Sequence, residues 1–105
     1  MSDTLSVTLP LQRWQGDRGT YHLVKIIGTD ADQIAMHARL HRLEFGSQRG
    51  FGSVKVVATI GDTEWKTSVF PQEKSTEWFL LVSKKVMRAE NLSEGDALSL
   101  TIAML

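Results

Sequence analysis

The sequence predicts a mainly β fold: a small β-barrel, closed or partly open, of about seven strands with one or two short helices. Short segments of alternating or β-branched apolar residues recur along the chain with turn residues between them, a pattern typical of barrels and sandwiches. The 105 residues include no internal repeat and no Pro- or Ser-rich linker, and this length suits one domain with one core. We therefore expect residues 1–105 to form a single β-barrel domain.

Seven segments have the length and the residue types of β-strands. The two prolines, Pro10 and Pro71, mark turns beside them, because proline fixes φ and cannot donate a main-chain hydrogen bond. The expected strands are Leu5–Leu9, Leu11–Gln15, Tyr21–Ile27, Ser53–Ile60, Thr63–Phe70, Glu77–Val82 and Ala97–Met104.

The clearest pairing joins Val54–Ile60 to Thr63–Val69 through a two-residue loop. Gly61 at the first central position favours a type II′ turn, because glycine readily adopts the positive φ that this position needs. The resulting register makes one face of the hairpin apolar and the other polar, as a half-buried sheet requires. The apolar-face pairs are Ile60/Thr63, Ala58/Trp65, Val56/Thr67 and Val54/Val69. A four-residue loop would shift every pair.

A first helix is expected to begin near Thr29 and Asp30, which are good N-cap residues, and to run to about Leu43. Its apolar residues do not form a single stripe. One stripe consists of Met36, Leu40 and Leu43, and the residues almost opposite are Ile34, Ala38 and Phe45. Such a helix is either buried on two sides or ends early.

A second, short helix is expected from Lys84 to about Asn91, because Ser83 is a good N-cap residue. The segment Leu92–Asp96 follows, and the turn at its end leads into the last strand. Gly95 occupies the third position of this turn, which favours type II because that position needs a positive φ.

The charge composition of the chain limits the kinds of partner that it is expected to bind. Twelve Lys and Arg residues balance twelve Asp and Glu residues. DNA-binding proteins usually carry a basic excess, because phosphate contacts supply most of their affinity, so we expect neither DNA binding nor a polybasic membrane contact.

The absence of cysteine excludes disulfides, thiolate catalysis and thiolate metal sites. No signal-peptide run or membrane-length apolar stretch is present, so we expect a cytoplasmic location.

Several motifs, in order along the chain, resemble a known family. They are Trp14 with Gly16, Tyr21–Val24, Arg49–Val56, Ala58–Gly61, Trp65–Pro71, Leu81–Ala89 and Leu92–Asp96. Together they resemble the bacterial domain-of-unknown-function family nineteen-oh-five over nearly the whole chain. This resemblance implies a small β-barrel with a short helix before the closing strand, and it implies no activity, because none is established for the family. The turn Leu92–Asp96 alone also resembles the Gly-Asp turn of swapped-hairpin transition-state regulators, some of which bind DNA as intertwined dimers.

The residues that best suggest a binding function are cationic and have aromatic neighbours. The candidate anion-binding residues are Arg49, Lys55, Lys66, Arg88 and Trp65. Arg49 lies in a glycine-punctuated loop, the two lysines share the polar face of the hairpin, and Arg88 follows Lys84 and Lys85 on the second helix. Arginine is suited to a planar anion because its guanidinium binds bidentately. The alternative is that the lysines are simply solvated and that Trp65 belongs to the core.

A weaker candidate is a metal site at His37, His41 and Glu44, which fall within a narrow arc of one helix. The alternative is a solvated helix face, because Arg39 and Arg42 beside them would repel a cation. No cofactor is implied, and no pair of residues supports an enzyme.

The function predicted from the sequence is therefore a non-catalytic binding or interaction module for a small anionic ligand or an acidic peptide. The alternative is a DNA-associated cradle-barrel transcriptional regulator that acts as a dimer.

Overall fold

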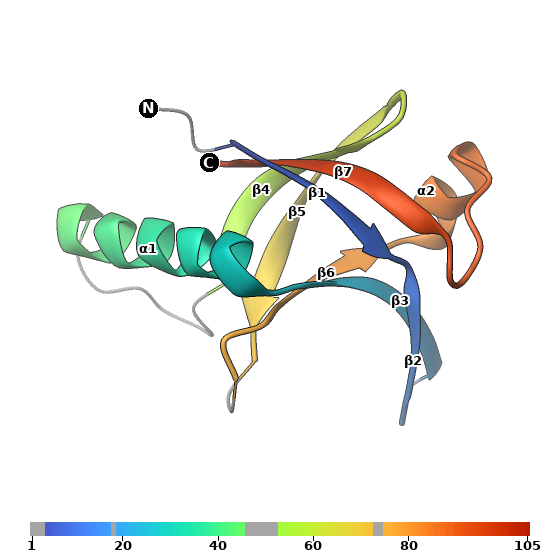
Figure 1. The fold of residues 1–105 in the computed structure, drawn as a ribbon, viewed down its shortest axis with the longest axis horizontal. Helices are drawn as coiled ribbons and strands as arrows, with labels where there is room; N and C mark the ends of the chain where they lie inside the picture. The colour runs from blue at the N-terminus through green and yellow to red at the C-terminus, as the bar shows by residue number, and fades with distance from the viewer. Residues whose placement is uncertain (1–3, 18, 46–52, 73–74) are drawn as a thin grey trace.

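The structure is a computed structural model that describes residues 4–17, 19–45, 53–72 and 75–105, with the backbone alone described for residues 41–45. Within these ranges the chain forms seven strands and two helices in the expected order (Figure 1). The strands are β1 (Thr4–Pro10), β2 (Gln12–Gly16), β3 (Gly19–Ile26), β4 (Val54–Ile60), β5 (Thr63–Pro71), β6 (Trp78–Val82) and β7 (Ala97–Met104). The helices are α1 (Gly28–Phe45) and α2 (Lys84–Ala89).

The strands form one antiparallel sheet in the order β1-β7-β4-β5-β6-β3-β2, which curls into an open half-barrel (Figure 1). No strand pairing in the described ranges joins the end strands β1 and β2 to each other, so the closed form of the expected barrel is wrong and the partly open form is correct. The physical reason is that β1 and β2 are consecutive. The single residue Leu11 separates them, so the chain itself connects the two ends of the sheet at a bend.

The concave face of the half-barrel contains the core, and the β4–β5 hairpin shows how the sequence specifies it. The expected register is confirmed, with Ala58 opposite Trp65 and Val56 opposite Thr67. Gly61 has a φ of +57°, and Asp62 is not among the residues with positive φ, as a type II′ turn requires. Along β4 buried and less buried residues alternate, because successive side chains of a strand point to opposite faces.

Helix α1 lies at one end of the half-barrel (Figure 1). Ala31 and Ile34 are buried in the core, whereas Met36 and Leu40 are 60% and 54% exposed. The helix is therefore neither buried on two sides nor ended early. It continues to Phe45 and has 18 residues, so it is longer than the short helix that was expected. No glycine or proline interrupts it after its first residue.

Helix α2 begins where it was expected. The Ser83 hydroxyl accepts a hydrogen bond from the Val86 amide at 3.3 Å, which confirms Ser83 as the N-cap. Val86 is the buried residue of the helix. The helix ends at Ala89, slightly earlier than expected, and the chain leaves it through Asn91, which has a φ of +54°.

Candidate binding site

A pocket forms where strands β3 and β6 separate. Their pairing runs from Ile26 with Trp78 to His22 with Val82. Beyond the last pair, β6 ends and the chain turns into α2, whereas β3 extends further and is paired on its other edge with β2. We call this opening the β3–β6 fork; it contains a pocket of about 250 Å³. The lining residues are Thr20, Tyr21, His22, Leu81, Val82, Ser83 and Lys84.

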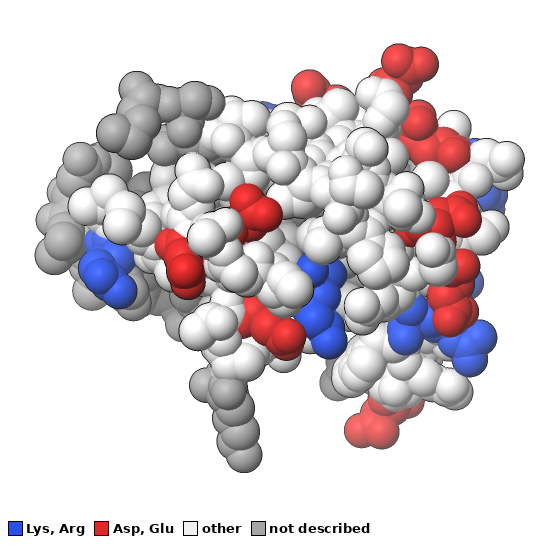
Figure 2. Space-filling model, in the orientation of Figure 1, with Lys and Arg blue, Asp and Glu red and all other residues white. Residues whose placement is uncertain are grey.

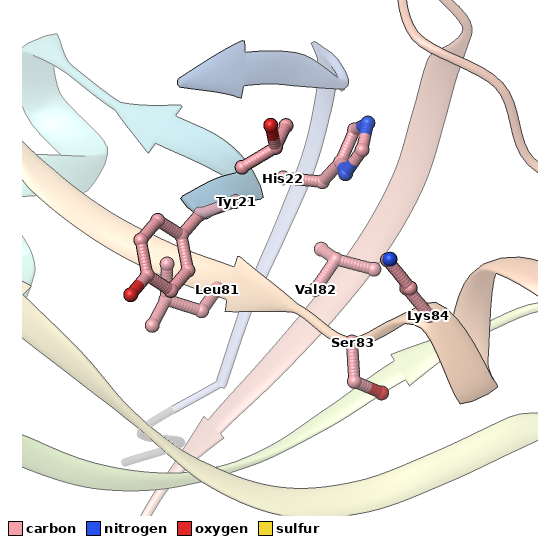
Figure 3. Close-up of a pocket in the computed structure, with 7 residues that line it drawn as sticks. Tyr21, His22, Leu81, Val82, Ser83 and Lys84 are labelled. Atoms are coloured by element: carbon pink, nitrogen blue, oxygen red, sulfur yellow. The ribbon is translucent and has the colours of Figure 1, made fainter. Parts of the chain in front are cut away.

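The ionisable groups of the pocket favour an anion. Lys84 supplies an ammonium group and His22 an imidazole, and no Asp or Glu is among the lining residues. Figure 3 shows the Lys84 and His22 side chains directed into the same space beside Val82. Such groups donate hydrogen bonds to a carboxylate or a phosphate, and Lys84 adds a positive charge.

The position of Lys84 is set by the local fold. Lys84 is the first residue of α2, directly after the N-cap Ser83. Because the Ser83 hydroxyl is bonded to the Val86 amide and Val82 is anchored in the core, the backbone on the N-terminal side of Lys84 is held at the mouth of the fork. The pocket is thus built on two well-supported elements, β3 and the β6–α2 junction.

The other side of the fork is apolar. Tyr21 and Leu81 line the pocket and lie on the convex face of the sheet, where Figure 3 shows them apart from His22 and Lys84. Tyr21 is directly opposite Trp14 on β2, and the two rings have their centroids 5.8 Å apart at an interplanar angle of 31°. Trp14, Tyr21 and Leu81 are all exposed, and we call these three residues the outer shelf.

Comparison with known protein families identifies the family of this chain. The family model described as a domain of unknown function, DUF1905, matches residues 8–102. The chain belongs to the DUF1905 family. The match includes β3, β6 and the start of α2, so the fork lies within the DUF1905 domain. A comparison with curated proteins finds no match. None of the described helices of this DUF1905 chain is long and apolar enough to cross a membrane.

The four expected anion-binding residues that the structure describes lie on three different surfaces of the DUF1905 fold. Lys55 and Lys66 are exposed on the convex face of the β4–β5 hairpin, diagonal to each other. Trp65 is opposite Ala58 and packs against the core, so it points to the concave face, away from both lysines. Arg88 is exposed on α2, and Arg49 lies outside the described residues.

The three metal candidates are only partly described. The His37 Nε2 atom lies 3.2 Å from the Leu105 carbonyl oxygen. The side chains of His41 and Glu44 lie outside the described residues. In the part of the chain that the structure describes, no three His, Cys, Asp or Glu residues form a group that could hold a metal ion.

Sequence reasoning found part of the fork and missed the rest. It identified Ser83 as the cap and Lys84 as a member of a cationic helix, but its candidate anion-binding residues were Arg49, Lys55, Lys66, Arg88 and Trp65. Tyr21 and His22 were read only as strand residues. The signal in the sequence that could have indicated the fork was the cationic first turn of α2, immediately after the end of an expected strand.

Proposed function

We propose that this DUF1905 chain is a non-catalytic binding module whose β3–β6 fork takes a small anion or an acidic peptide terminus. The observation that carries this proposal is the lining of the fork, in which Lys84 and His22 share a pocket with hydroxyl groups and with no carboxylate. A concave pocket with apolar walls and a few convergent polar groups is the usual form of a ligand site.

The fork is a better candidate than the hairpin lysines because more than one group can contact an anion there. Lys55 and Lys66 are exposed on an open face of the sheet, where water and salt screen their attraction for an anion. Lys84 is also exposed, but it lines a pocket together with a second hydrogen-bond donor, His22. An anion held there can contact several groups at once.

The arrangement of the hydroxyl groups favours binding over catalysis. Ser83 is the serine adjacent to Lys84, yet its oxygen accepts the Val86 amide as a helix cap. A nucleophilic serine needs a base that removes its proton and donors that stabilise the oxyanion. The role of Ser83 as a cap supports a structural assignment for this residue.

Thermal unfolding in the presence of anions tests the proposal. The probes are inorganic phosphate, acetate and a short peptide with a free carboxyl terminus, compared with chloride at equal ionic strength. A ligand at about 100 times its Kd stabilises the folded chain by about 2.7 kcal/mol. At least one probe should raise the unfolding temperature of the wild type above that in chloride.

Two lysine variants locate the site. Lys84→Gln should abolish the shift, because it removes the charge at the fork. Lys85→Gln should retain it, because Lys85 is an exposed neighbour on the same helix that does not line the pocket. The proposal is wrong if no probe gives a shift, or if the two variants lose the shift equally.

A further inference from the structure

We infer that the ligand of the β3–β6 fork is a monovalent carboxylate that carries an aromatic group; this inference rests on the proposed function, because it uses the same pocket. The juxtaposition that leads to it is the shared position of Tyr21 and Leu81. Both line the pocket that contains Lys84, and both belong to the outer shelf. The pocket spans the fork, with Lys84 and His22 on one side and Tyr21 and Leu81 on the other. A ligand whose charge meets Lys84 and that extends through the fork therefore meets an apolar surface.

The charge of the pocket sets the charge of the ligand. Among the seven residues that line the fork, Lys84 is the one Lys or Arg, and none is Asp or Glu. A single carboxylate is neutralised by one ammonium group, whereas a phosphate monoester carries about −1.5 to −2 at neutral pH and would stay partly unpaired. Charge complementarity thus favours a carboxylate over a phosphate.

The exposure of the outer shelf indicates that the ligand has an apolar part. Trp14 is 55% exposed, Leu81 40% and Tyr21 36%. Single exposed apolar side chains are common on protein surfaces, but neighbouring ones that line a pocket with a few polar groups are typical of ligand sites. An aromatic group laid over Tyr21 and Leu81 would remove apolar surface of both partners from water.

The shelf is also held in place before a ligand arrives. Gly16 provides the space for the Trp14 ring, because a Cβ at this position would lie 2.6 Å from Trp14 Cζ3. The indole then lies against the Tyr21 ring across the β2–β3 pair, with the two ring planes tilted by 31°. Trp14 acts here as a positioning residue for the Tyr21 ring, which reduces the ordering cost of binding.

Three matched probes separate the two parts of the ligand. They are acetate, which has only the charge, 3-phenylpropionate, which has the charge and the ring, and 3-phenylpropionamide, which has only the ring. We expect 3-phenylpropionate to bind at least tenfold more tightly than acetate. Tenfold corresponds to about 1.4 kcal/mol, which requires the removal of only about 60 Å² of apolar surface from water.

Two variants on the convex face test where the ring lies. Leu81→Ser should reduce the ratio of the two affinities to about one and leave acetate binding unchanged. Phe70→Ser is the matched control, since Phe70 is 37% exposed on the same face and does not line the fork; it should leave the ratio unchanged. In the wild type, amide chemical shifts induced by 3-phenylpropionate should be largest at Tyr21, Leu81 and Lys84, which gives a readout that needs no variant.

The outcomes distinguish the inference from the proposed function. Acetate and 3-phenylpropionate binding equally, both dependent on Lys84, would overturn the aromatic ligand and leave the anion site intact. Binding of 3-phenylpropionamide as tight as that of the carboxylate would overturn both, because the charge would then not be recognised. Shifts at Phe70 that exceed those at Leu81 would place the ring elsewhere and overturn the inference alone.

Discussion

The main chains of Leu11 and Gly95 are hydrogen-bonded where the sheet bends. The Gly95 amide donates to the Leu11 carbonyl at 2.8 Å, and the Leu11 amide donates to the Asp96 carbonyl at 2.8 Å. These bonds attach the turn before β7 to the residue that joins β1 to β2. Leu11 is also buried in the core. The turn and the bend therefore support each other, and both ends of the half-barrel depend on them.

Gly95→Val should destabilise the chain by roughly 1–3 kcal/mol, the usual cost of backbone strain. Gly95 has a φ of +91°, a region that a β-branched residue adopts only under strain. A Cβ built at Gly95 meets no heavy atom within 4 Å, so the cost comes from the backbone and not from a collision. Urea denaturation measures it, with Glu94→Ala as an exposed control in the same turn. An unchanged midpoint for Gly95→Val would contradict this account of the turn.

Thr63→Val should destabilise the chain by roughly 1.5–3 kcal/mol, the range for a hydrogen bond to a charged group. The Thr63 hydroxyl donates to Glu90 Oε2 at 2.6 Å. This bond connects the start of β5 to the residue that follows α2. The substitution keeps the shape of the side chain and leaves the Glu90 oxygen without this donor. Thr101→Val, at an exposed position of β7, is the control, and equal effects of the two substitutions would argue against a stabilising Thr63–Glu90 bond.

Gly61→Ala should be more harmful than its backbone strain alone. Gly61 has a φ of +57°, and a Cβ at this position would collide with the Glu90 carboxylate. Glu90→Ala removes that obstacle. In a double-mutant cycle of unfolding free energies, Gly61→Ala should therefore cost less in the Glu90→Ala background than in the wild type. Strictly additive effects would show that the carboxylate moves aside without cost.

The chain should not bind random duplex DNA tightly at physiological salt. Its formal net charge is zero, and Figure 2 shows acidic and basic side chains interspersed on the face in view. A protein that neutralises several phosphates needs a basic surface, and its affinity falls steeply with salt. Fluorescence anisotropy with a labelled duplex measures this. Sub-micromolar binding that weakens strongly with salt would favour the regulator over the small-ligand module.

The sequence specified local pairings well because the evidence for them is local. Alternation with period two and one glycine were sufficient to place Ala58 opposite Trp65. The opening of the barrel could not be read in this way. It depends on the end strands β1 and β2 not pairing with each other in the described ranges, which is a property of the whole sheet. No periodicity within one segment reports which strands form the ends of a sheet.

The candidate binding site was harder to predict than the fold, because it too depends on segments that are far apart in the chain. Tyr21 and Lys84 belong to one pocket only because β6 ends and turns into α2 beside β3. In the sequence, Lys84 was grouped with Lys85 and Arg88 as the cations of the second helix, and Tyr21 was interpreted only as a strand residue. By contrast, Lys55 and Lys66 had a predictable common face, which drew attention to the hairpin.

Substitutions in α1 should show that it packs on one face only. Ile34 is fully buried, so Ile34→Ala should destabilise the chain by about 2–5 kcal/mol, through lost burial and the cavity left behind. Met36 and Leu40 are more than half exposed, so replacing either with alanine should change the unfolding free energy by less than about 0.5 kcal/mol. Alanine is a good helix former, so the difference between the positions reports packing rather than helix propensity. Urea denaturation of the three variants measures it. A cost at Met36 or Leu40 that approaches the cost at Ile34 would mean that the apolar outer stripe of α1 is covered in solution, and the one-sided packing of this helix would then be wrong.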